Sequence, residues 1–195
     1  MLLWPPIRGC TYSEGMILAD FRVNGRPRTK GSLKTYCMKD AKHTVRVQEE
    51  VAESKSWRMR VARASREYQL AEFGALRQFG GAVEVRIVMW FPREQAVNGG
   101  PIPSHDTPWP VAITIGDVDK LARNVLDALS LPTKRAHIPL TSGLIRDDSQ
   151  VVSLAVLKFW ETEENPAGMW ILVTDVTEKA EGIGAKQAES LRVLP

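Results

Sequence analysis

The sequence predicts a small mixed α/β sheet, of the α+β type, with helices packed on it. Three observations point to this fold class. Apolar side chains alternate over Val83–Phe91, as in a strand with one apolar face. Apolar side chains recur at helical spacing between residues 48 and 73, and again after Gly116. The predicted elements follow one another as β–α–β–α–β–β, an order that packs helices against a sheet.

The first half of the chain begins with a predicted strand at Met16–Val23, followed by the turn signal Asn24-Gly25. A basic segment without helical or strand period comes next. Residues 48–73 then form the longest helical candidate, which we expect to pack on the sheet. Its predicted apolar stripe consists of Trp57, Val61, Ala64, Tyr68 and Ala71.

In the second half, Pro92 ends the strand at Val83–Phe91, and the proline-rich residues 93–110 predict an irregular loop. A helix follows from Gly116 to about Ser130. Two further strands are predicted at Val151–Trp160 and Met169–Val176, and the short acidic turn between them predicts a hairpin.

Length and composition indicate one domain of ordinary globular type. The chain has 195 residues, of which 44% are hydrophobic and 25% charged. No apolar run approaches the roughly 20 residues that cross a bilayer. Neither of the two cysteines lies in a CxxC motif, so we expect a reduced, cytoplasmic protein. We expect a flexible leader over residues 1–15, the folded domain over residues 16–176 and a polar tail over residues 177–195.

Two acidic pairs are the strongest chemical signal. Asp117 and Asp119 stand at the start of the second predicted helix, where they can converge on one point. Asp147 and Asp148 directly precede an apolar strand, and we expect the two pairs to meet at one end of the sheet. Carboxylates so crowded repel one another unless a cation neutralises them, and oxygen ligands suit Mg²⁺ or Mn²⁺. The alternative is that acids at a helix start only complement the helix dipole.

Basic residues accompany the acidic pairs. Between Arg22 and Arg46 the chain carries eight Lys or Arg residues and one acidic residue. Such a segment beside an acidic site suits a phosphodiester substrate, although it also suits a solvated loop. The candidate nucleic-acid contacts in this segment are Arg26, Arg28, Lys30 and Lys34. Lys134 and Arg135 lie in a second basic loop, between the two acidic motifs, and are further candidates for phosphate contacts.

Three motifs carry a resemblance to a known family: Asp117-x-Asp119-Lys120-Leu121, Val125-Leu126-Asp127-Ala128-Leu129 and Asp147-Asp148-x-Gln150-Val151. In this order they resemble the RusA-type Holliday junction resolvases, which are crossover junction endodeoxyribonucleases. The resemblance is closest over residues 116–160. It implies a RusA-like fold, a homodimer and Mg²⁺-dependent cleavage of four-way DNA junctions in recombination or repair, often in a phage setting and thus in a bacterial cytoplasm.

The resemblance also implies roles for single residues. It assigns metal binding to Asp117, Asp119 and Asp148, with Asp147 as a less certain fourth ligand. Lys120 stands where many relatives have Asn, and we count it among the candidate DNA contacts.

Arg123 stands where the family has a catalytic Lys. Arginine stays protonated, so it can hold a phosphate but cannot act as a general base. If the family's Lys shuttles a proton, Lys120 is a candidate to replace it here. A salt bridge from Arg123 to Asp119 or Asp127 is the structural alternative. Two other functions stay open: a nuclease for other branched or flap DNA, and a catalytically idle DNA-binding protein with the same fold.

Overall fold

The computed structural model describes residues 15–30, 33–37, 45–49, 52–92, 109–110, 116–131 and 142–177. Residues 33–37 and 45–49 are described by their backbone alone. The expected leader, the expected C-terminal tail beyond residue 177, Lys134, Arg135 and most of the predicted loop at 93–110 lie outside the described residues.

A four-stranded mixed sheet forms the centre of the described fold, which confirms the predicted fold class. Its strand order is β1–β6–β4–β5. The strands are β1 (Ile17–Asn24), β4 (Val83–Phe91), β5 (Val151–Trp160) and β6 (Gly168–Asp175). β4 pairs in parallel with β5 and antiparallel with β6, and β6 pairs antiparallel with β1.

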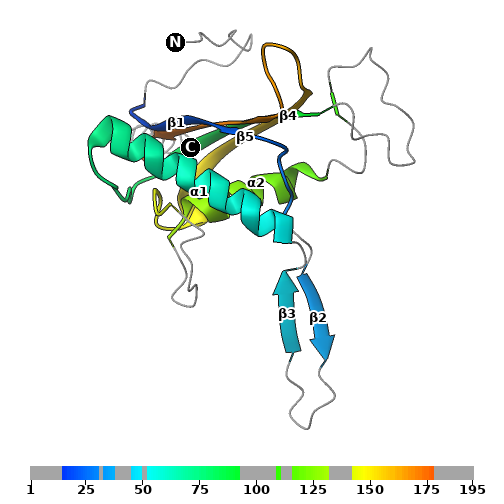
Figure 1. Ribbon diagram of the computed structural model, residues 1–195. Helices are drawn as coiled ribbons and strands as arrows, with labels where there is room; N and C mark the ends of the chain where they lie inside the picture. Colours follow the sequence, from blue (N-terminus) through cyan, green and yellow to red (C-terminus); the bar gives the residue numbers. More distant parts are fainter. Residues whose placement is uncertain are drawn as a thin grey trace, which may run out of the picture.

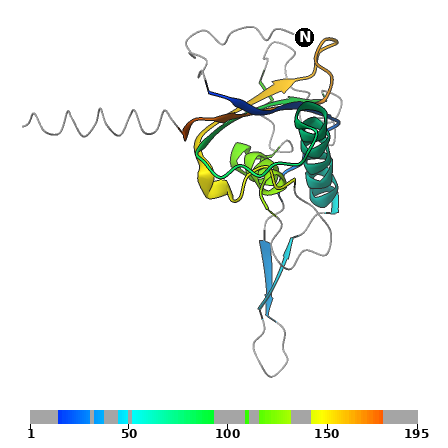
Figure 2. The same cartoon turned by 90° about the vertical axis from the view of Figure 1, so that its left-hand side faces the viewer.

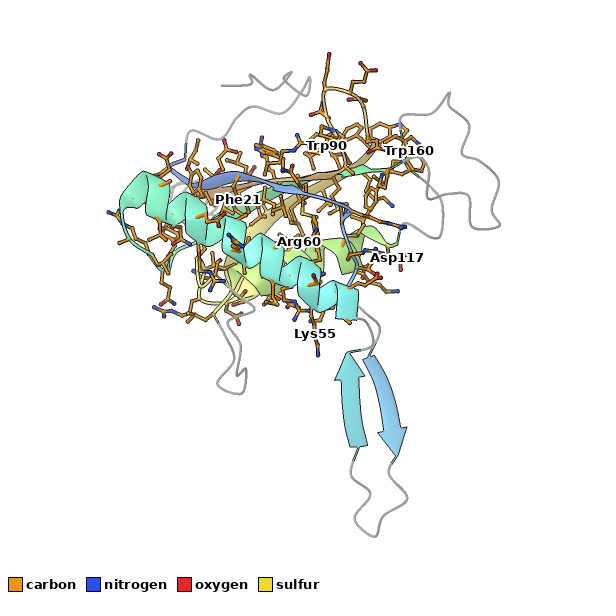
Figure 3. The ribbon with its side chains drawn as sticks, viewed as in Figure 1. Phe21, Lys55, Arg60, Trp90, Asp117 and Trp160 are labelled. Carbon is orange, nitrogen blue, oxygen red and sulfur yellow. The ribbon has the colours of Figure 1, made fainter. Side chains whose placement is uncertain are left out.

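Two helices, α1 (Ala52–Phe73) and α2 (Val118–Leu129), lie on the same face of this sheet (Figures 1 and 2). The alternating row of β4 from Val83 to Phe91 is buried beneath them. α2 buries Leu121, Val125 and Leu129 in the same core as this row, as the helical spacing predicted. On β1, Phe21 faces α1, where its ring lies 6.4 Å from that of Tyr68 (Figure 3).

The basic segment after β1 differs from its prediction. It contains two short antiparallel strands, β2 (Leu33–Cys37) and β3 (Val45–Glu49), which project from the body of the protein as a hairpin (Figure 1). Alternating valines at 45 and 47 pair with β2, and this long-range pairing removes residues 48 and 49 from the predicted helix. The helix α1 therefore begins at Ala52 and not near residue 48.

The predicted hairpin between the last two strands is also wrong. β4 lies between β5 and β6 and pairs with both of them. The chain that leaves β5 crosses the end of β4, where the Glu161 N–H donates to the carbonyl oxygen of Phe91 at 2.9 Å. A central strand with a fully apolar row gains most from a neighbour on each side, and the short turn is long enough to cross one strand.

The apolar stripe predicted for α1 holds only in part. Trp57 and Val61 are buried, whereas Ala71 is exposed. Several polar side chains of α1 are buried instead, among them Arg58 and Gln69. No helix within the described ranges is both long and apolar enough to span a membrane.

Candidate functional site

The loop after β1 packs against the start of α2. Gly116 has a φ of +92°, and a Cβ atom at this position would lie 2.2 Å from Cγ2 of Thr29. Glycine therefore permits both the left-handed backbone and the close approach of the loop. Lys30, the residue after Thr29, donates its backbone N–H to the carbonyl oxygen of Lys120 at 3.1 Å. Residues 25–30, which we call the basic loop, are thus neighbours of the first acidic motif, Asp117 and Asp119.

Asp117 occupies the N-cap position of α2, as its place in the sequence predicted, but its side chain makes no capping hydrogen bond. Its carboxylate pairs instead with the Lys120 ammonium at 2.9 Å, and the side chain is 66% exposed. This partner lowers the pKa of Asp117 and raises the pKa of Lys120. Lys120 is therefore a protonated cation at neutral pH.

Asp119 and Arg123 lie one helical turn apart on α2, and both are exposed. Arg123 forms no ion pair within the described residues, so the predicted salt bridge to Asp119 or Asp127 is not seen there. Asp127 pairs with Lys30 at 2.6 Å and with Arg58 at 3.4 Å. The guanidinium of Arg123 therefore faces solvent beside the first acidic pair.

A buried polar network, which the sequence did not reveal, holds the basic loop between the helices. Asn124 is fully buried and accepts a hydrogen bond from Nε of Arg58 at 3.0 Å. Its amide nitrogen donates to the carbonyl oxygen of Arg28 at 2.9 Å and lies 3.4 Å from that of Ser54. The signal in the sequence is an amide three residues after Leu121, on the apolar stripe of a helix.

The second acidic motif forms a turn before β5 and does not lie on the strand. Asp147 caps a short 3₁₀ helix, η3 (Asp148–Gln150), by accepting a hydrogen bond from the Ser149 N–H at 3.0 Å. Hydrogen bonds from the side chain and from the backbone N–H of Ser149 lower the pKa of Asp147. Asp148 is exposed. The carboxylate of Asp147 therefore stabilises the turn, whereas the exposed carboxylate of Asp148 can bind a metal ion.

The direction of α2 decides how far apart the two acidic motifs lie. α2 connects the parallel strands β4 and β5 and therefore runs back along them. At its start, the Lys158 ammonium near the end of β5 donates to the carbonyl oxygen of Gly116 at 3.2 Å. At its end, the Ile145 N–H donates to the carbonyl oxygen of Leu129 at 3.2 Å, just before β5 begins.

Within one chain, then, Asp117 and Asp119 lie at one end of α2 and Asp148 at the other. A helix of 12 residues is about 18 Å long. The expectation that both acidic motifs meet at one end of the sheet is wrong for a single chain. The described residues contain no group of three His, Cys, Asp or Glu side chains that could hold a metal ion.

The candidate DNA contacts differ in how free they are. Lys30 is engaged by Asp127, and Arg28 pairs with Glu53 at 2.8 Å. Burial lowers the pKa of Arg26, and the nearby charge of Arg28 lowers it further. Lys34 belongs to β2, whose side chains are not described.

No family model matches this chain, and a search of curated proteins also finds no match. The resemblance to RusA-type resolvases therefore rests on the sequence motifs alone.

Proposed function

We propose that the protein is a Mg²⁺-dependent endodeoxyribonuclease that cleaves four-way DNA junctions and acts as a homodimer. The observation that carries this proposal is the position of the acids at the two ends of β5. Asp148 precedes the start of this strand, and Gly116-Asp117 lies beside its end through the contact with Lys158. One chain supplies each half of a metal site, but at separate places.

A second copy of the chain can unite the two halves. β5 is an edge strand of the described sheet. Its Val152 and Leu154 side chains are 62% and 45% exposed, and apolar side chains on a sheet edge favour pairing with another strand. Antiparallel association of two β5 strands brings the start of one beside the end of the other. Asp148 of one protomer then approaches Asp117 and Asp119 of its partner.

Twofold symmetry creates this arrangement twice, so that a dimer carries two equivalent composite sites. A four-way junction has two opposed strands of equal geometry, which matches two symmetric sites. Three carboxylates from two chains form an oxygen donor set that suits Mg²⁺, with Mn²⁺ as an alternative. The bound ion supplies the Lewis acidity that phosphodiester hydrolysis requires.

The residues around the composite site have separate tasks in this proposal. Arg123 is exposed on the same face as Asp119 and can hold a phosphate oxygen through its planar guanidinium. Lys120 pairs with Asp117 and contributes positive charge beside the site. Arg123→Ala should reduce cleavage strongly and Arg123→Lys should restore part of it. Full activity of the Ala variant would remove Arg123 from the mechanism.

The substrate is tested with a four-way junction, a flap and a plain duplex, each with Mg²⁺ or with EDTA. Symmetric paired nicks in the junction alone, lost in Asp119→Asn while binding persists, would support the proposal. Glu163→Gln, in the exposed turn after β5, changes charge equally and should keep cleavage. Cleavage of flaps alone would instead indicate a nuclease for other branched DNA.

A catalytically idle DNA-binding protein is the second candidate function. The separation of Asp148 from Asp117 and Asp119 within one chain favours it, since a chain that does not dimerise through β5 has no complete metal site. Binding of junctions without cleavage under Mg²⁺ or Mn²⁺ would select this candidate.

A further inference from the structure

A hollow of about 190 Å³ opens between the loop after β1 and the first turns of α1. We call it the arginine pocket. Three of its six lining residues are arginines and one is an acid, so its net charge is positive. The lining residues are Arg26, Arg28, Glu53, Ser56, Trp57 and Arg60.

Glycine at position 25 allows the pocket to form. Gly25 has a φ of +106°, and a Cβ atom there would lie 2.8 Å from Nη1 of Arg60. The guanidinium of Arg60, on the exposed side of α1, therefore rests against the loop (Figure 3). Opposite it, Glu53 holds the guanidinium of Arg28 at 2.8 Å.

The charges inside the arginine pocket are incompletely balanced. Burial and the charge of Arg28 both disfavour the protonated form of Arg26, and Glu53 offsets only part of this effect. An anion in the pocket would relieve the repulsion between the arginines.

We propose that the arginine pocket binds a phosphate group of the DNA backbone, on the same strand as the phosphate that is cut. Guanidinium groups bind phosphate through paired N–H donors, and the hydroxyl of Ser56 adds a further donor. The identity of the ligand as DNA rests on the proposed function, whereas the phosphate chemistry of the pocket does not.

The loop that lines the pocket also contacts the first acidic motif. Arg28 is two residues before Lys30, whose N–H bonds to the carbonyl oxygen of Lys120. Two residues of chain span at most about 7 Å. To this length are added the hydrogen bond to Lys120 and the step to Asp119, so a strand whose reacting phosphate lies at Asp119 can place a phosphate a few nucleotides away in the pocket. Arg60 would then be a positioning residue that sets the register of the strand.

The first measurement uses inorganic phosphate as the probe, against chloride at equal ionic strength. Phosphate should raise the melting temperature of the wild type and of Arg63→Gln, but not of Arg60→Gln. Arg63 lies exposed on the same helix and pairs with Glu67 at 2.7 Å, so it is a matched control for charge. Arg26→Gln is a second pocket variant, and it too should lose the phosphate effect.

The second measurement is junction binding in EDTA over a range of salt concentrations. Loss of one phosphate contact lowers the slope of log K against log salt by about one, and weakens binding about eightfold at 0.1 M salt. Arg60→Gln should show this change and Arg63→Gln should not. Equal effects of the two variants in both measurements would mean that phosphate responds to the overall surface charge. This result would refute the proposal that the arginine pocket binds phosphate.

Failure of the pocket and failure of the proposed function give different results. If the wild type cuts junctions but Arg60→Gln and Arg63→Gln bind them equally well, phosphate binding in the pocket is refuted and the nuclease function is not. In another outcome the wild type never cuts junctions, while phosphate stabilises it but not the pocket variants. This result refutes the nuclease function and supports the phosphate site. A pocket that binds inorganic phosphate while Arg60→Gln leaves the junction slope unchanged refutes the DNA assignment.

Discussion

A mixture of Asp119→Asn and Asp148→Asn chains should recover cleavage that neither variant has alone. If each site combines Asp119 of one chain with Asp148 of its partner, a mixed dimer has one site with both lesions and one intact site. Random reassociation makes about half of the dimers mixed, so about one quarter of all sites should be intact. Asp119 lies at the start of α2, whereas Asp148 follows beyond its other end. One chain therefore cannot supply both acids to one site, and a composite site must give this result.

The assay uses a supercoiled plasmid with an extruded four-way junction. The wild type should cut both opposed strands and linearise the plasmid. The mixture should produce mainly nicked circles, because a mixed dimer can cut only one strand. The two variants are refolded together or expressed together, with different tags that allow the mixed dimer to be isolated.

Absence of any nicking by the isolated mixed dimer would refute the composite site. Full activity of Asp148→Asn by itself would refute it in another way, because Asp148 would then not belong to the site. Asp147→Asn provides a contrast. Its carboxylate caps η3, so that variant should disturb the turn before β5 rather than remove a ligand.

Three further changes have outcomes that follow from single contacts. Gly116→Ala should lower the free energy of unfolding in urea by about 1–3 kcal/mol, because it combines a left-handed backbone with a clash against the basic loop. Asn124→Ala should lower the same quantity by about 1–3 kcal/mol, because buried partners lose their hydrogen bonds. Lys120→Met should raise the pKa of Asp117 toward its ordinary value, as seen by carboxyl NMR, so that Asp117 takes up its proton at a higher pH.

Each of these changes has a control in the same protein. Gly74→Ala shares the left-handed backbone, with a φ of +67°, but its new Cβ atom meets nothing within 4 Å. A loss as large as that of Gly116→Ala would mean that the clash has no effect. Arg123→Ala, on the exposed side of α2, should leave the free energy of unfolding nearly unchanged. In Lys120→Met the pKa of Asp147 should not move, because it is set by the hydrogen bond from Ser149.

Local patterns were enough to locate most of the elements. The alternation over Val83–Phe91 and the apolar run at Val151–Trp160 gave the bounds of β4 and β5 as the structure has them. The spacing of Leu121, Val125 and Leu129 gave the buried face of α2. These patterns succeed because side-chain periodicity follows directly from the geometry of a strand or a helix.

Features that depend on distant partners were missed. The β2–β3 hairpin pairs residues such as Leu33 and Glu49. The sequence around either residue does not indicate which strand it pairs with. Asn124 looked like one more polar residue on a helix, although it connects α1, α2 and the basic loop.

The sequence by itself determined which residues can perform chemistry: two acidic pairs, an arginine one turn after the first pair, and a basic loop. Only the tertiary structure decided their arrangement. Because α2 crosses back between two parallel strands, its start and the start of β5 lie at opposite ends of the sheet, which no reading of adjacent residues could reveal. Strand direction therefore places Asp148 apart from Asp117 within one chain, and any metal site that unites them needs a second chain.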